Sequence, residues 1–197
     1  IRASCHFSMS RRGAVAATQR GGVLERVSAA TGNWDPARPT EGAYAALLEF
    51  AGGAFASLVY SGYAHLDADA FMNDTTELGL PRDASRYGAA RRTLAGVRDA
   101  AAEAELKHTR GYGGSAFAAT DAGMPRSHEH FGVYIVSCDR ADLRPLPDGV
   151  TIHGDDAVRF EPLAPPSIPR REVIDELHAA IVDGVAPLHD GAWGRAT

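Results

Sequence analysis

A diglycine between two alternating apolar runs is the feature that most constrains how this chain can fold. Gly52 and Gly53 stand between the runs AYAALLEF and AFASLVYS, within the stretch from Thr40 to Asp69. Glycine reaches the positive φ of a tight turn because it has no Cβ atom to clash. The stretch is therefore predicted to form a β-hairpin, followed by a polar tail of Tyr, His and Asp residues.

A two-residue turn at the diglycine would place Ala51 opposite Ala54. Because side chains alternate along a strand, one face would then carry the pairs Phe50/Phe55, Leu48/Ser57, Ala46/Val59 and Tyr44/Ser61. The opposite face would carry Glu49/Ala56, Leu47/Leu58 and Ala45/Tyr60. Neither face is polar enough to face water, so we expect a helix to cover one and a sheet or a second subunit to cover the other.

Shorter runs with strand character lie on both sides of this hairpin. Alternating or apolar patterns predict strands at 23–31, 131–138, 149–153 and 157–161. The last three follow one another without a helix, which predicts an antiparallel meander added to the hairpin. Residues 1–22 show no sustained period, and we expect them to form an irregular leader.

Apolar residues at spacings of three and four predict two helices. The first spans 84–108 and is capped by Asp83; the second spans 170–183 and stops at Gly184. The apolar side of the second helix is expected to face the core, with the side chains of Val173, Ile174, Leu177 and Ile181. The sequence thus predicts one α+β domain over 23–197, a mostly antiparallel open sheet with two or three helices packed on one face.

The composition narrows the class of partner and the compartment. Of the 197 residues, 45% are hydrophobic and 23% charged, as in a soluble globular protein, and a net charge of -5 without a basic cluster argues against nucleic acid. No apolar run approaches the roughly 18 residues of a membrane-spanning helix, and no signal peptide is visible. Cys5 and Cys138 are too few for a disulfide framework, so we expect a cytoplasmic protein.

The tail of the hairpin is the first candidate site. Tyr63, His65 and Asp67 occupy alternate positions after the second strand, so they could face one pocket and bind a substrate. A His/Asp pair in such a pocket could assist proton transfer. The alternative is that His65 and Asp67 only hydrogen-bond the backbone where the strand ends, and the sequence alone favours this structural role.

A second cluster, His128 and His130 around Glu129, precedes a predicted strand. Two histidines at this spacing hold zinc or iron only if a third ligand folds close to them, such as His65, Asp67 or His153. Without a second spaced ligand pair the signal is weak, so no metal is predicted. The histidines are expected to lie on the surface or to line a substrate pocket.

The sequence lacks the motifs that bind a dinucleotide. A Rossmann fingerprint needs GxGxxG between a strand and a helix, so that backbone amides reach the pyrophosphate. The cluster Gly111, Gly113 and Gly114 instead follows a predicted helix and precedes a loop. Lys107 is the only lysine, so a phosphate loop of the Walker type is excluded as well.

Three blocks of the sequence resemble, in the same order, the C-terminal part of one oxidoreductase family. They are TEGAYAALLEFAGGAFASLVYSGYAHLDAD, HFGVYIVSCDRADLRPLPDGVTIHGDDA and VIDELHAAIVDGVAPLHDGAWGRAT. The family is that of glucose-fructose oxidoreductase, inositol dehydrogenase and MocA (Gfo/Idh/MocA). Within it the chain is most similar to the phthalate dihydrodiol dehydrogenase type, over residues 23–197.

This resemblance implies one half of a two-domain dehydrogenase that acts on a small cyclic diol or a sugar-like substrate. In the family, an N-terminal Rossmann domain binds NAD or NADP, and a C-terminal α+β domain closes the substrate pocket and contacts other subunits. The family's catalytic lysine lies in a Glu-Lys-Pro motif, which Lys107 in ELKHT does not match. The Rossmann domain and the catalytic residues are therefore expected to be missing here, and the chain alone is expected to be inactive.

A second hypothesis makes the chain a non-catalytic remnant or self-association module that binds no nucleotide. Under either hypothesis the hairpin face that carries Leu47/Leu58 is expected to be buried against a partner, because an exposed apolar patch favours association. Leu47, Leu58 and Tyr60 are therefore the candidate residues of a homo-oligomer interface. The expected partners are a small-molecule substrate and a second copy of the chain, with neither nucleic acid nor membrane.

Overall fold

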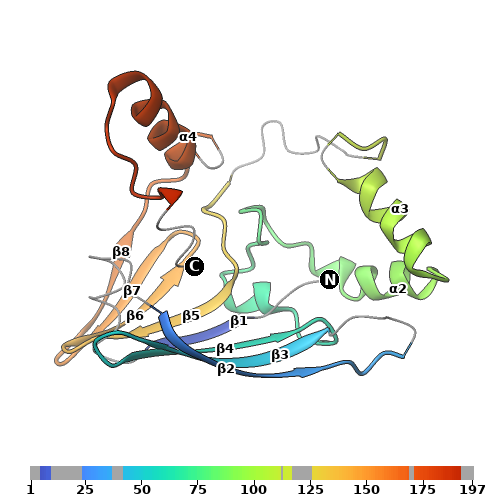
Figure 1. Ribbon diagram of the computed structural model, residues 1–197, viewed down its shortest axis with the longest axis horizontal. Coiled ribbons are helices and arrows are strands. Elements are labelled where there is room, and N and C mark those ends of the chain that lie inside the picture. The colour runs from blue at the N-terminus through green and yellow to red at the C-terminus, as the bar shows by residue number, and fades with distance from the viewer. Residues whose placement is uncertain are drawn as a thin grey trace.

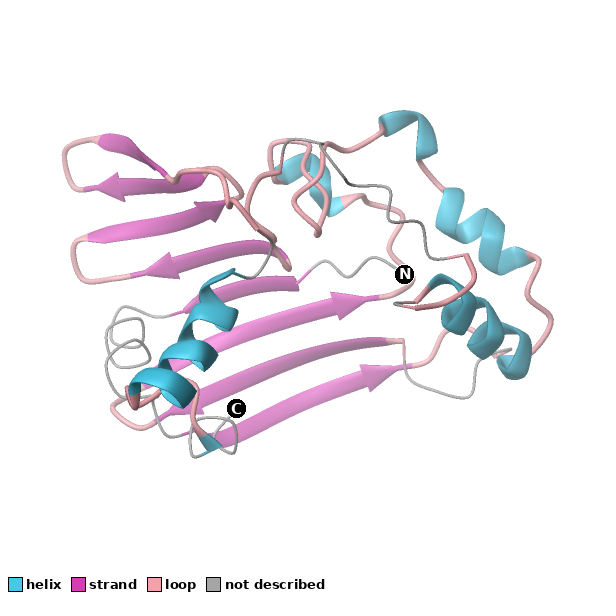
Figure 2. Ribbon diagram, turned by 90° about the horizontal axis from the view of Figure 1, so that it is seen from above, coloured by secondary structure: helices cyan, strands magenta, loops and turns pink. Residues whose placement is uncertain are grey.

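The strands of the computed structural model form a single eight-stranded sheet in the order β2-β3-β4-β1-β5-β6-β7-β8. The structure describes residues 5–9, 24–36, 42–111, 113–116, 126–168 and 171–191. Its strands are β1 (Cys5–Met9), β2 (Leu24–Gly32), β3 (Ala43–Phe50), β4 (Ala54–Ser61), β5 (Gly132–Ser137), β6 (Ala141–Leu146), β7 (Gly149–Gly154) and β8 (Val158–Pro162). All neighbouring strands are antiparallel except β1 and β5, which are parallel. Figures 1 and 2 show the sheet as one curved, open layer.

The helices lie on one side of this sheet, with α4 at one end and α2 and α3 at the other (Figure 1). They are α2 (Ala89–Ala95), α3 (Ala100–Arg110) and α4 (Arg171–His178), with short 3₁₀ turns η1 (Ala68–Phe71) and η2 (Ala84–Arg86) and a π-helical turn η3 (Ala179–Asp183). The predicted α+β class and the mostly antiparallel open sheet are confirmed. No helix among the described residues is long and apolar enough to cross a membrane.

The central hairpin forms where the diglycine predicted it, but its register differs by one residue. Phe50 pairs with Ala54, so the connection contains Ala51 as well as the two glycines. Gly52 and Gly53 both have positive φ, of 91° and 82°. Side chains alternate along a strand, so the longer connection puts the β4 residue predicted to pair with each β3 residue on the opposite face of the sheet.

The true register gives the hairpin two unequal faces. The inner face carries the pairs Phe50/Ala54, Leu48/Ala56, Ala46/Leu58 and Tyr44/Tyr60, and the rings of the last pair stack at 5.4 Å. Ala54 and Ala56 on this face are buried. The outer face carries Glu49/Phe55, Leu47/Ser57, Ala45/Val59 and Ala43/Ser61, and Arg26 of β2 pairs there with Glu49.

The prediction of an irregular leader over 1–22 is wrong for residues 5–9. They form β1, which lies between β4 and β5 and pairs with both. The meander therefore joins the hairpin through β1 rather than directly. A run of five residues is too short to show an alternation, and its position depends on partners distant in sequence. The other residues of the leader lie outside the described part of the chain, as do residues 117–125 of the loop predicted after Gly114.

Sequence reasoning also missed β6, whose sequence ADLRPL contains Pro145. A proline cannot donate to a sheet ladder and usually argues against an inner strand. β6 pairs with β5 only through Leu143 and Asp142, whereas it pairs with β7 along its whole length. Pro145 therefore lies beyond the β5 pairing, where β6 behaves as an edge strand and tolerates the missing N–H group.

The predicted helix over 84–108 is broken into two. Gly88 enters α2 with a left-handed φ of 74°, and Gly96 ends it. Asp99 then starts α3, because its side chain accepts a hydrogen bond from the N–H of Ala102 at 2.8 Å. The helix-ending Gly96 and the N-cap Asp99 three residues later favour two short helices over one long helix.

The second predicted helix forms as α4 and η3, and Gly184 ends it with a φ of 67°. Its orientation was predicted wrongly, because the apolar side chains expected inside are exposed. The exposed residues are Val173, Ile174, Leu177 and Ile181. Periodicity shows that a helix has an apolar side, but it does not show what covers that side.

A cluster of buried residues lies where the segment 68–80 packs beside β5. Met72 is 1% exposed there, and Ala68, Asp69 and Thr75 are buried with it. The side chain of Arg144 in β6 donates a hydrogen bond to the carbonyl of Phe71 at 2.7 Å. This segment positions the loops that carry the candidate site.

Candidate functional site

Tyr63 lies against the loop that leaves β2. Its hydroxyl donates a hydrogen bond to Asn33 Oδ1 at 3.0 Å and accepts one from the N–H of Trp34 at 3.3 Å. The rings of Tyr63 and Trp34 are 5.2 Å apart, and a Cβ atom on Gly42 would lie 2.6 Å from the Tyr63 hydroxyl. Tyr63 therefore joins the loop after β4 to the loop after β2. It does not line the neighbouring pocket, which is described next.

That pocket has a volume of about 340 Å³ and lies between the loop after β4, the segment that contains α2 and the end of α3. It brings together His65 and Asp67, two of the three residues predicted to share a pocket. The residues that line it are Gly62, Ala64, His65, Leu66, Asp67, Asp83, Arg86, Tyr87, Gly88, Ala89, Ala90, Arg91, Thr93, Leu94 and Arg110. We call it the arginine pocket.

Asp67 is held in place by structural contacts. Its side chain caps η1 by accepting a hydrogen bond from the N–H of Asp69 at 3.3 Å. It also pairs with Arg82 Nη1 at 3.4 Å, and both of these side chains are 16% exposed. The hydrogen bond from Arg82 to Asp74 is the main cause that raises the pKa of the arginine. Asp67 therefore forms one fixed corner of the arginine pocket.

His65 lies in the same loop and also lines the arginine pocket. Its ring is exposed, and its backbone carbonyl accepts a hydrogen bond from the Tyr87 hydroxyl at 2.9 Å. Arg91 Nη1 donates to the neighbouring carbonyl of Ala64 at 3.4 Å. Two side chains from the α2 segment thus hold this loop against the wall of the pocket.

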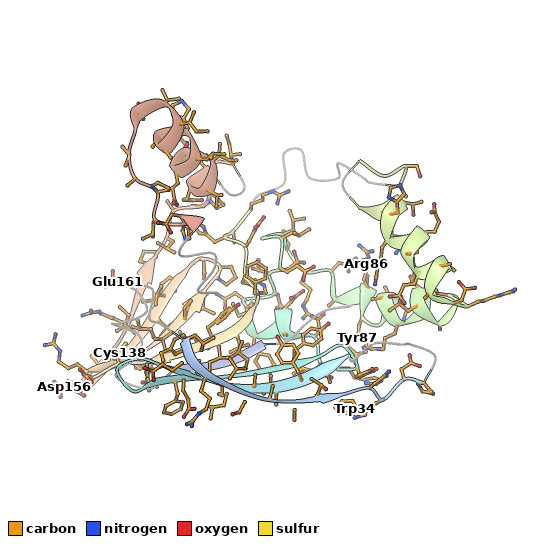
Figure 3. The ribbon with its side chains drawn as sticks, viewed as in Figure 1. Trp34, Arg86, Tyr87, Cys138, Asp156 and Glu161 are labelled. Carbon is orange, nitrogen blue, oxygen red and sulfur yellow. The ribbon has the colours of Figure 1, made fainter. Side chains whose placement is uncertain are left out.

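Three arginines give the pocket its charge. Arg86 comes from η2, Arg91 from α2 and Arg110 from the last turn of α3. The guanidinium of Arg91 lies 4.9 Å from the centre of the Tyr87 ring, a cation–π contact. Figure 3 labels Arg86 and Tyr87 on the segment that leads into α2.

The two carboxylates of the pocket are already engaged. Asp67 pairs with Arg82, as described above. Asp83 caps η2 by accepting hydrogen bonds from the hydroxyl and the N–H of Ser85, at 2.6 and 3.0 Å. The Ser85 hydroxyl is the main cause that lowers the pKa of Asp83, followed by the Ser85 N–H, and the nearby charge of Arg86 adds to it. Asp83 therefore remains an anion at neutral pH. The pocket still has an excess of positive charge, because three arginines and only two carboxylates line it.

A smaller pocket of about 230 Å³ lies beside β5 and α4. It is lined by Leu78, Arg126, Ser127, His128, Glu129, Pro166, Glu172 and Val173. Nε2 of His128 is 2.9 Å from the carbonyl oxygen of Ala164, and its backbone N–H donates to the carbonyl of Pro147 at 2.8 Å. His128 thus lines a pocket, as one of the two expectations for it stated.

His130 lies apart from this pocket, in the core. Its side chain is buried, with Nε2 2.9 Å from the carbonyl oxygen of Thr75 and Nδ1 accepting a hydrogen bond from the N–H of Gly132 at 3.2 Å. These partners require that Nε2 carries the proton in the neutral ring. With both nitrogens occupied, His130 joins residues 68–80 to β5 and is not placed to contact a substrate.

The described residues do not form a site for a metal or a dinucleotide. No group of three His, Cys, Asp or Glu side chains among them is arranged to hold a metal ion. The glycines 111, 113 and 114 follow α3, and a Cβ atom on Gly114 would lie 2.3 Å from the carbonyl oxygen of Thr109. This turn closes on its own helix, so it does not offer the open amide cradle that a pyrophosphate needs.

The candidate interface residues are divided between the two faces of the sheet. Leu47 is on the outer face and 39% exposed, whereas Leu58 and Tyr60 are half-buried on the inner face. The outer face instead joins Leu47 with Phe55 and Val59, which are 45% and 48% exposed. The one-residue difference in register accounts for this division.

The chain is similar to known dehydrogenases. It is 38% identical over 176 residues, which make up 89% of this chain, to a curated protein of Comamonas testosteroni named 1-carboxy-3-chloro-3,4-dihydroxycyclohexa-1,5-diene dehydrogenase. It also matches a crystal structure of an inferred dehydrogenase from Bordetella bronchiseptica RB50, with a TM-score of 0.75 and 31% identity over 99% of this chain. No profile of a known protein family matches the chain.

The chain is thus an α+β domain that is similar to part of two proteins named as dehydrogenases. Both matches are consistent with the resemblance of its sequence blocks to the C-terminal domain of Gfo/Idh/MocA oxidoreductases. The chain spans 44% of the length of that relative and 56% of the length of the Bordetella structure.

Sequence reasoning overlooked the arginine pocket. Arg86 and Arg91 stand within the helix predicted over 84–108, and Arg110 follows it, so neither spacing nor motif connected the three. The break between α2 and α3 lets the end of α3 contribute to the same pocket as η2. The one available signal was the strong bias of the basic residues toward arginine, since Lys107 is the only lysine.

Proposed function

We propose that the chain is the substrate-binding and oligomerisation part of an NAD- or NADP-dependent dehydrogenase that oxidises a small cyclic diol. The observation that carries this proposal is the match over 89% of the chain to a relative named as a dehydrogenase of a dihydroxycyclohexadiene. The arginine pocket supports it, because its volume of about 340 Å³ falls within the range of roughly 300–1,000 Å³ that is common for small-molecule sites.

In this proposal the nicotinamide cofactor is bound outside the 197 residues. The described residues do not fit a dinucleotide, so no step of the reaction is assigned to them through the cofactor. The catalytic lysine of the family likewise has no counterpart, since Lys107 pairs with Glu103 on the surface of α3 at 2.7 Å. The chain would bind and orient the substrate. A second domain would hold the cofactor that accepts the hydride.

Large exposed apolar surfaces support the proposal of a larger assembly. The apolar side of α4 is one such surface, with Val173, Ile174 and Leu177 each at least 56% exposed. We infer that the remainder of the longer protein covers it, since the chain spans less than half of its curated relative.

The outer face of the hairpin is a second such surface. Leu47, Phe55, Val59 and Ile135 share this face across β3, β4 and β5. In our proposal a second copy of the chain covers this face by sheet-to-sheet packing, because a two-fold axis brings the same apolar patch of the two copies together.

The test is to express the whole gene product that carries this chain and to follow the reduction of NAD and NADP with cyclic cis-diols. Reduction that depends on the diol is expected, while the 197-residue chain alone should give no calorimetric signal with either nucleotide. Failure of the whole product to reduce either cofactor with any cyclic diol would reject the proposal. It would favour the alternative, a self-association module without nucleotide binding, as would the lack of an upstream GxGxxG motif.

A further inference from the structure

We propose that the arginine pocket binds the carboxylate of a small cyclic organic acid. The inference rests on the proposed function only in taking the ligand to be the substrate of the dehydrogenase. Its physical basis is that three arginines, an aromatic residue and apolar residues from separate segments line one pocket.

Two of the three arginines have donors to offer. Among the described residues, the side chains of Arg86 and Arg110 make no hydrogen bond or ion pair with another residue, although Arg86 lies near enough to Asp83 to lower the pKa of that carboxyl. Each guanidinium carries five N–H donors in a planar fork, and that fork matches the two oxygens of a carboxylate. An anion in the pocket would therefore gain partners without displacing a protein contact of Arg86 or Arg110.

The third arginine is fixed in position before a ligand arrives. Arg91 lies over the Tyr87 ring at 4.9 Å, and it donates to the carbonyl of Ala64 at 3.4 Å. Tyr87 is itself held by the hydrogen bond from its hydroxyl to the carbonyl of His65 at 2.9 Å. A guanidinium held in place loses less conformational entropy when it binds an anion, so Arg91 adds both charge and geometry.

The remaining walls fit the ring of such an acid. Leu66 and Leu94 line the pocket beside Tyr87, so it offers apolar surface as well as charge. Asp67 is paired with Arg82, which does not line the pocket, and the single charge of Asp83 offsets only part of the three positive charges. A free phosphate would use the charge but not the apolar walls, and for this reason the carboxylate of a cyclic acid is favoured.

The first experiment measures binding of benzoate to the 197-residue chain by titration calorimetry, with benzyl alcohol and inorganic phosphate as comparison probes. Benzoate is expected to bind at least about tenfold more tightly than either comparison probe, because it alone satisfies both the charge and the apolar wall. Arg86→Gln and Arg110→Gln should each weaken benzoate binding about tenfold or more, since each removes a charged hydrogen-bond partner.

Arg140→Gln is the matched control, because Arg140 is exposed in the turn between β5 and β6, away from the pocket. It should leave benzoate binding unchanged, and circular dichroism should show all three variants folded. The double variant Arg86→Lys/Arg110→Lys keeps the charge but loses the planar fork of N–H donors. It should bind benzoate more tightly than the Gln variants and more weakly than the native chain. Equal binding of benzoate and benzyl alcohol, tighter binding of phosphate than of benzoate, or equal loss in Arg140→Gln would overturn the proposal.

A second experiment separates this inference from the proposed function. In the whole gene product, Arg86→Gln should raise KM for a carboxylated cyclic diol about tenfold and leave KM for the uncarboxylated diol unchanged. If the enzyme oxidises both diols with the same KM in native and variant forms, the carboxylate site is rejected while the dehydrogenase stands. If benzoate binds the chain through these arginines but no diol is oxidised, the proposed function fails and the carboxylate site remains.

Discussion

Gly79 illustrates how one residue can hold two distant segments together. It has a φ of 77°, and its carbonyl accepts a hydrogen bond from the N–H of Ser127 at 2.8 Å. A Cβ atom at this position would lie 2.2 Å from the carbonyl oxygen of Ser127, so the approach of the two backbones requires glycine. The segment that carries His128 therefore depends on Gly79 for its position.

We predict that Gly79→Ala lowers the free energy of unfolding by roughly 2 to 5 kcal/mol, because it adds a backbone clash to an unfavourable φ. Gly53→Ala is the matched control: Gly53 has a similar φ of 82°, but a Cβ atom there would meet nothing within 4 Å. The control should cost only about 1 to 2 kcal/mol. Urea denaturation measures both, and equal losses would contradict the role given to the Ser127 contact.

Glu176 provides a prediction about pH. Its carboxylate accepts a hydrogen bond from the N–H of His189, at 2.8 Å, and contacts the His189 ring at 2.7 Å. The backbone hydrogen bond is the main cause that lowers the pKa of Glu176 below its ordinary value of 4.5. A group whose pKa is lowered by folding stabilises the chain above its unfolded pKa, and this contribution is lost as the pH falls through the folded pKa.

The free energy of unfolding of the native chain should therefore fall more steeply with acid than that of Glu176→Gln, between about pH 5.5 and pH 3. Urea denaturation at a series of pH values measures the two curves. Glu161→Gln, in the exposed strand β8, is the control and should follow the native curve. Parallel curves for the native chain and Glu176→Gln would show that the contact to His189 contributes no stability.

At the scale of the element, the register of the hairpin determines which side chains interact. The three-residue connection places the Tyr44 and Tyr60 rings together at 5.4 Å, whereas it puts Phe50 and Phe55 on opposite faces. A two-residue turn would do the reverse for the phenylalanines. The register is thus open to a direct energetic test.

A double-mutant cycle on Tyr44→Ala and Tyr60→Ala should give a coupling of about 0.5 to 1.5 kcal/mol, the usual value for an aromatic pair. The same cycle on Phe50→Ala and Phe55→Ala should give a coupling near zero, because these side chains do not share a face. Chemical denaturation of the native, single and double variants supplies both values. A larger coupling between the phenylalanines than between the tyrosines would support the shorter turn.

For the molecule as a whole, the amount of exposed apolar surface is the dominant property. Few apolar side chains among the described residues are buried, and they are Ala43, Ala54, Ala56, Ala68, Met72 and Pro147. Four of these are alanines, which contribute little apolar area each. The described part of the chain thus has a small core, and its wider apolar surfaces need partners.

We predict that Phe55→Asp weakens self-association of the chain at least about tenfold, because it would bury an unpaired charge in the proposed sheet-to-sheet interface. Sedimentation equilibrium measures the effect. Val173→Asp, on the exposed side of α4, is the matched control and should leave self-association unchanged. A native chain that sediments only as a monomer, or equal weakening by both variants, would refute the interface.

Much of the fold was predictable because its signals are local. The alternation from Ala43 to Ser61, the positive φ at Gly52 and Gly53, and the stop at Gly184 each depend on a few neighbouring residues. The candidate site was less predictable for the same reason. His65 and Asp67 line one pocket, which the sequence left open beside the favoured structural role, whereas Tyr63 and His130 are held by hydrogen bonds to segments distant in sequence.

The sequence by itself thus determined that the chain has a central diglycine hairpin, a later meander and an amphipathic final helix, and its blocks resemble one oxidoreductase family. Only the tertiary structure decided the register of that hairpin, the insertion of β1 beside it, and the meeting of Arg86, Arg91 and Arg110 in one pocket. The physical reason is range. Turn and strand preferences act between neighbours in sequence, whereas register, strand order and pockets depend on contacts that form only when distant segments pack together.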